Sequence, residues 1–191
     1  MRTLLTRSLL PAALFLGVCS VAAAREESPE RAAQRDILAL ADNLDDPDVT
    51  FMAHNIVMAH DSCSISSVFA SGDHFGPGIG SLTRAGHRNR VGHLLDDYAR
   101  KAPPREELEK HQADLDRTAR MVMSMSELAP YRNPRADKSG SKQSQEWQRV
   151  SAEFKANARE FRAAVNAKEP ERVQKASGKL HNTCSDCHRL L

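Results

Sequence analysis

Five residues near the C-terminal end of the sequence, Cys184-Ser185-Asp186-Cys187-His188, constrain the structure of this chain most. On a helix, positions 184, 187 and 188 are related as i, i+3 and i+4, so two sulfurs and an imidazole project from one face. A CxxCH pattern is the signal for c-type haem attachment, in which the thiols form thioethers and the histidine ligates iron. The motif therefore predicts a helix that holds one flat macrocycle at three points.

Two other chemistries use the same residue types. Cys184, Cys187 and His188, with His181 one turn earlier, could all bind zinc. Structural zinc sites usually draw two ligand pairs from separated segments, however, and the sequence has no second pair of cysteines. A thioredoxin-like redox pair normally opens a helix that follows a strand. One covalently attached haem c is therefore the expected cofactor, with zinc binding and thiol redox chemistry as alternatives.

Residues 1–24 have the pattern of a secretory signal peptide. Arg2 and Arg7 precede a short apolar core, and three alanines ending at Ala24 offer a cleavage site. The apolar core is too short to span a bilayer as a mature helix. Cys19 raises a lipidated alternative, which we rank below simple cleavage because Val18 stands where a small residue is expected. We expect a periplasmic protein with no membrane span in its mature form.

Residues 25–191 form the expected mature chain, which is long enough for one domain with a core. The leader holds two of the 27 Lys and Arg residues and none of the 25 Asp and Glu residues, so the mature chain is formally neutral. A neutral chain lacks the basic excess of nucleic-acid-binding proteins. We therefore expect no nucleic-acid partner.

The spacing of apolar residues predicts an all-α chain. Aromatic residues make up only 5% of the sequence, and runs of alternating β-branched residues are absent. Residues 71–86 are rich in glycine and predict a loop, and 130–144 predict a solvated connector. Whether the first two helical segments form two helices or one kinked helix stays open. The expected helical segments are 29–44, 49–69, 87–101, 105–129, 145–167 and 170–191.

The last two segments, with the CxxCH motif, resemble the cytochrome c′ family, the class II c-type cytochromes. The resemblance covers residues 146–188, including the break at Glu169-Pro170. It implies a four-helix bundle in which 49–69 and 105–129 supply the first two helices. An extra N-terminal helix and an insertion at 70–104 depart from the family pattern. The resemblance also implies axial His188, and subunit pairing into a homodimer is common in the family.

Members of this family differ at the sixth iron position. In some it is open and binds nitric oxide or carbon monoxide, whereas in others a methionine of the first bundle helix ligates the iron. The run from His54 to Met58 is similar to the family's Arg-x-x-x-Met pattern, so the resemblance makes Met58 a distal or sixth-ligand candidate. Helical geometry gives His60 as a competing distal or sixth-ligand candidate. His60 lies near the centre of an apolar stripe that contains Met52 and Ile56.

Methionines on apolar stripes usually fill a core. That simpler interpretation applies to Met52, Met58, Met121 and Met125 alike, and histidines among apolar residues are more often hydrogen-bonded than metal-bound.

These observations predict an exported monohaem cytochrome that transfers electrons to redox partner proteins by Fe(III)/Fe(II) cycling. Binding of a small gas ligand is the alternative. Catalysis is the weaker expectation, because the sequence shows no constellation of proton donors for an open iron.

Overall fold

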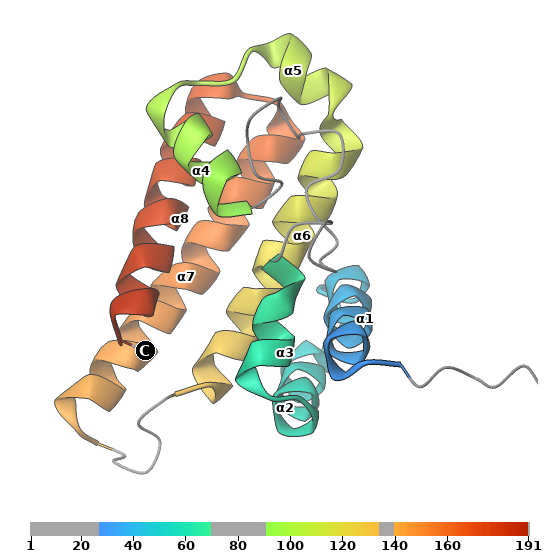
Figure 1. The fold of residues 1–191 in the computed structure, drawn as a ribbon. Coiled ribbons are helices and arrows are strands. Elements are labelled where there is room, and N and C mark those ends of the chain that lie inside the picture. The colour runs from blue at the N-terminus through green and yellow to red at the C-terminus, as the bar shows by residue number, and fades with distance from the viewer. Residues whose placement is uncertain (1–26, 70–90, 134–139, 191) are drawn as a thin grey trace, which may run out of the picture.

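The computed structural model describes residues 27–69, 91–133 and 140–190, and within these ranges every regular element is a helix (Figure 1). The all-α prediction is therefore confirmed for the described part of the chain. The predicted signal peptide and glycine-rich loop lie outside the described residues.

Three long helices form the centre of the fold: α6 (Gln112–Leu128), α7 (Lys142–Ala167) and α8 (Pro170–Leu190). Figure 1 shows α7 between the other two, and α7 packs against both of them. Phe161 of α7, Leu115 of α6 and Leu180 of α8 are fully buried where these helices meet the core. Burial of side chains of this size contributes roughly 1.5–3 kcal/mol each, so these contacts hold the three helices together.

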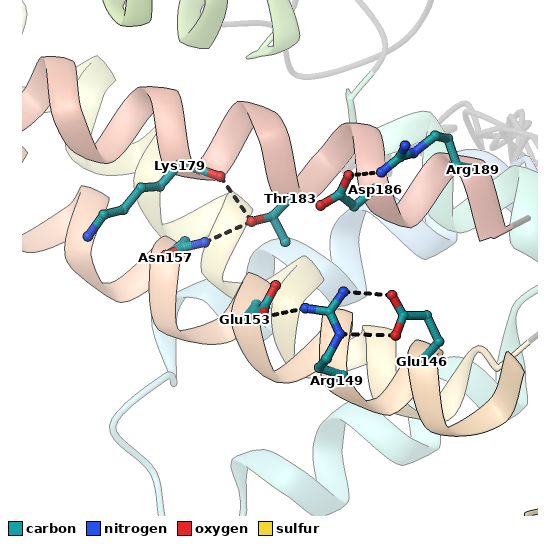
Figure 2. Close-up of polar contacts among 8 residues, drawn as sticks. All are labelled: Glu146, Arg149, Glu153, Asn157, Lys179, Thr183, Asp186 and Arg189. Carbon is teal, nitrogen blue, oxygen red and sulfur yellow. Dashed lines mark hydrogen bonds and ion pairs between the residues drawn. The ribbon is translucent and has the colours of Figure 1, made fainter. Parts of the chain in front are cut away.

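The α7–α8 pair also carries polar contacts, which Figure 2 shows. Asn157 Nδ2 donates to Thr183 Oγ1 at 2.7 Å, and that hydroxyl donates to the carbonyl oxygen of Lys179 at 2.9 Å. Thr183 is buried, so its hydroxyl is satisfied by both helices. Nearer the start of α7, Arg149 bridges Glu146 and Glu153 on the exposed face.

Helix α4 (Val91–Arg100) packs against α8 (Figure 1). Gln174 of α8 donates from Nε2 to the carbonyl oxygen of Ala99 at 3.3 Å. A Cβ built on Gly178 would lie 3.8 Å from the Cβ of Ala99, which is an ordinary van der Waals contact, so alanine would also fit at this crossing. The short helix α5 (Arg105–Lys110) then leads into α6.

The structure divides the helix expected over 105–129 into α5 and α6. His111, between them, leaves helical geometry with φ −109° and ψ 20°.

Helix α1 (Pro29–Asp42) packs against α6 and α3, and it confirms the helical segment predicted from residue 29. The Ser28 side chain accepts from the backbone N–H of Arg31, and Pro29 is the first helical residue, as predicted.

The single helix expected over 49–69 is wrong. The chain forms α2 (Val49–Ala59), α3 (Ser62–Ser66) and the 3-10 turn η1 (Ser67–Phe69). His60 is extended between α2 and α3, and Asp61 starts a new helix by accepting hydrogen bonds from the backbone N–H and hydroxyl of Ser64 at 2.8 and 2.9 Å. An Asp that caps a new turn competes with the continuing helix.

The boundaries of α7 and α8 lie close to the sequence prediction. Ser141 caps α7, which begins at Lys142, three residues earlier than expected, and Lys168 ends it in left-handed geometry with φ 54°. Pro170 is the first residue of α8, as predicted. In the described ranges we find no helix with both the length and the apolar character needed to cross a membrane.

Candidate functional site

The CxxCH motif occupies the last turns of α8, in continuity with the helix's buried face. Val173, Ala176 and Leu180 are fully buried at spacings of three and four residues. Cys184 continues this stripe and packs against the hydrophobic core. The core therefore fixes the rotation of α8, and with it the direction in which the motif faces.

Cys184, Cys187 and His188 line one cavity of about 310 Å³. The two cysteines are half-buried, while His188 is exposed. The cavity's volume lies at the small end of the range of roughly 300–1,000 Å³ found for ligand pockets. The helical prediction thus brings all three motif side chains to one site.

Segments from most of the described chain build the walls of this cavity. Helix α3 and η1 contribute Ile65 and Phe69, α4 contributes Leu95, and α7 contributes Trp147 and Phe154. From α6 come Val122, Met125 and Leu128, which face the cavity at helical spacing. Apolar side chains dominate, so the cavity suits an apolar ligand that polar groups hold at its edges.

Trp147 fixes one end of the cavity. Its Nε1 donates to the carbonyl oxygen of Ala129 at 2.9 Å and so joins the start of α7 to the end of α6. Ala129 opens the 3-10 turn η4 (Ala129–Tyr131), which is followed directly by Arg132.

Arg132 supplies a guanidinium group to the cavity wall. Its Nη1 donates to Ser62 Oγ at 3.2 Å, and its Nη2 donates to the carbonyl oxygen of His60. The Nε atom is buried without a hydrogen-bond partner. A buried, unused N–H beside an apolar cavity fits a ligand that brings an anionic or carbonyl oxygen to this edge.

The same guanidinium acts on Asp61, where α3 begins. Hydrogen bonds from Ser64 are the main cause of a lowered pKa for the Asp61 carboxyl, and the charge of Arg132 adds to the effect.

Both motif thiols are neutral in this environment. Burial raises the pKa of the Cys184 thiol to about 11, and the neighbouring Cys187 raises it further in the same direction. Burial also raises the pKa of Cys187. Reactive redox cysteines have lowered pKa values, so these shifts are opposite to those of a thioredoxin-like pair.

The residues present fit a c-type haem. Two thiols and an imidazole share one helical face, the adjoining cavity is lined by apolar side chains, and Arg132 offers a donor for a haem carboxylate. In the described residues, no group of three or more His, Cys, Asp or Glu side chains is arranged to hold a metal ion. A haem iron does not need such a group, because the porphyrin supplies four of its ligands.

The other predicted site residues lie elsewhere. Met58 is on α2 with 73% of its surface exposed, and it does not line the cavity. His60 caps α2, and its Nε2 lies 2.8 Å from Asp36 Oδ2 of α1. Burial of the Asp36 carboxyl favours its neutral form, but hydrogen bonds from His60 and Arg35 outweigh burial and lower its pKa.

Sequence reasoning missed two residues of the cavity. Arg132 was expected in a solvated connector, yet it is half-buried in the cavity wall. Met125 was expected chiefly as core filling, and its spacing from Val122 and Ala129 was the available signal for a shared face.

Comparison with protein-family models, with curated proteins and with solved structures found no match for this chain.

Proposed function

We propose that this chain is an exported monohaem c-type cytochrome that transfers electrons. The observation that carries the proposal is the shared cavity: Cys184, Cys187 and His188 face one apolar space that adjoins the core. A CxxCH sequence that occurred by chance on a solvated helix would not need an enclosing set of aromatic and aliphatic walls.

Each residue has a defined part in this proposal. Cys184 and Cys187 form the two thioethers, and His188 ligates the iron. When bound, the haem supplies an iron that alternates between Fe(III) and Fe(II). The apolar walls limit the access of water, and Arg132 donates a hydrogen bond toward a carboxylate at the cavity edge; burial and hydrogen bonding of this kind tune a haem's potential.

The architecture that we propose is a cytochrome c′-type bundle. Its support is the order of α6, α7 and α8, with the motif at the far end of the last helix and α2–α3 beside α6. Export through residues 1–24, redox partner proteins and homodimer formation are parts of the same proposal.

The test is expression with the complete leader in a bacterium that attaches c-type haem. We expect haem that remains on the chain after denaturing electrophoresis, and a visible spectrum that changes reversibly between oxidised and dithionite-reduced forms. Cys184→Ser with Cys187→Ser should abolish covalent attachment, whereas the matched control Cys63→Ser, at an exposed cysteine, should retain it. A colourless wild-type protein would overturn the proposal, and zinc analysis of that protein would then test the structural-zinc alternative.

Gas binding is the second candidate, favoured by the apolar character of the cavity. Such walls admit a neutral diatomic molecule without unpaired polar groups. Ready binding of carbon monoxide by the reduced protein would favour this function over electron transfer.

A further inference from the structure

Of the methionines in the described ranges, Met125 alone lines the cavity that holds the CxxCH side chains. Met121 and Met123 are buried in the core, where Met123 Sδ lies 3.9 Å from Arg162 Nη1. Met52 packs against the core, and Met58 is exposed to solvent.

The burial of Met125 differs from that of its neighbours. Met121, Val122 and Leu128 are each 1% exposed, but Met125 is only partly buried although it lies between them on α6. Its side chain therefore borders the open volume of the cavity. A methionine that served only to fill the core would be expected to match the burial of the residues around it.

Helix α6 also stands on the correct side of the cavity. It packs on α7, as α8 does, and Figure 1 shows the two helices on either side of α7. The two axial ligands of a haem iron approach opposite faces of a flat ring, so the second ligand must come from an element other than the one that carries His188.

His181 does not meet this condition. It lines the cavity, but it belongs to α8 and precedes His188 by seven residues, so both imidazoles start from the same side of the helix. The remaining polar side chains that the described residues bring to the cavity are Ser62, Ser66, Arg132 and the indole of Trp147, which are poor iron ligands.

We infer that Met125, and not Met58, is the second axial ligand of the haem iron. This inference rests on the proposed haem function and specifies it. Thioether ligation opposite histidine raises a haem's reduction potential and fills the position that a gas would need. It therefore favours electron transfer over gas binding.

The experiment compares wild type, Met125→Leu and Met58→Leu as exported haem-loaded proteins. Leucine nearly conserves the volume of methionine, so the core should persist, and far-ultraviolet circular dichroism checks the helices. We expect a low-spin wild type with a sulfur-to-iron charge-transfer band and no ready reaction with carbon monoxide. Met125→Leu should lose the band, become high-spin and bind carbon monoxide, whereas Met58→Leu should match wild type.

The outcomes separate the two proposals. Wild type without covalent haem overturns the proposed function. Three outcomes overturn Met125 ligation but leave the proposed function standing. They are a high-spin wild type with covalent haem, a Met125→Leu variant that keeps the wild-type spectrum, and a Met58→Leu variant that loses the charge-transfer band. If Met125→Leu does not fold, Met125→His replaces it: a low-spin spectrum with a lowered midpoint potential supports the inference, and an unchanged potential overturns it.

Discussion

The burial of Cys184 predicts slow thiol chemistry in the folded, haem-free chain. The chain from residue 25 is produced without haem, kept under reducing conditions and alkylated with iodoacetamide. Burial raises the pKa of the Cys184 thiol from 9.0 to about 11. At pH 8 a thiol with the ordinary value is about 10% thiolate, whereas Cys184 would be about 0.1% thiolate. Because the thiolate is the nucleophile, we expect alkylation about 100-fold slower than that of an ordinary thiol.

Peptide mass spectrometry after timed quenching measures the rate at each cysteine separately. Exposed Cys63 is the internal control and should react first. The rate at Cys184 should rise about tenfold for each pH unit up to about pH 11, since the thiolate fraction does so. Alkylation of Cys184 at pH 8 as fast as that of Cys63, with no acceleration toward pH 11, would refute the placement of this thiol in a buried wall.

Three further predictions concern stability, each measured by urea denaturation of the haem-free chain. Arg132→Gln should lower the free energy of unfolding by about 1.5–3 kcal/mol, since charged hydrogen bonds to the α2–α3 junction are lost. The control Arg149→Gln, which breaks only exposed ion pairs, should lower it less. Equal losses in the two variants would show that the Arg132 hydrogen bonds do not stabilise the α2–α3 junction. Thr183→Val should cost about 1–3 kcal/mol because Asn157 loses its acceptor, and a neutral effect would show that this amide finds water instead. The folded-state pKa of Cys184 is raised, so above pH 9.0 the folded chain keeps a proton that the unfolded chain loses. The contribution of Cys184 to stability should be full below pH 9.0, and the free energy of unfolding should fall by about 2–3 kcal/mol by about pH 11. Cys184→Ser should not show this loss.

Local sequence signals predicted α8 and its motif well. Pro170 at the first helical position and the spacing of Val173, Ala176 and Leu180 depend only on helical geometry, which the surrounding fold does not alter. Cys184 lies four residues after Leu180 and, by the same geometry, packs against the core.

The α2 region was harder because its apolar residues surround the helix. Phe51 and Met58 are as apolar as Ile56 and Val57, yet only the latter two are buried. A helix with apolar residues on several sides gives no unique inward face. The break after Ala59 had a local signal in Asp61, a favoured N-cap residue, but the apolar pattern that continues beyond it obscured that signal.

The cavity itself had no signal in sequence, because it arises where distant segments pack together. Arg132 shows this most clearly: nothing in a Pro- and Lys-containing connector indicates that a guanidinium will reach back to the carbonyl oxygen of His60. Only the docking of η4 beside the α2–α3 junction brings those groups together.

The contact between α4 and α8 has a consequence for the order of folding. Ala99 and Gln174, which it joins, are 75 positions apart in the sequence, whereas α7 and α8 are nearly consecutive. Closure of a longer loop costs more conformational entropy, so we expect α4 to dock after α7 and α8 have paired. Pulse-labelling hydrogen exchange would contradict this order if the amides of α4 were protected first.

Until α4 docks, the cavity lacks the wall that Leu95 belongs to. The nascent protein would therefore pass through a stage in which the motif helix is formed and still accessible, and the time spent there would decide how many molecules receive the proposed haem.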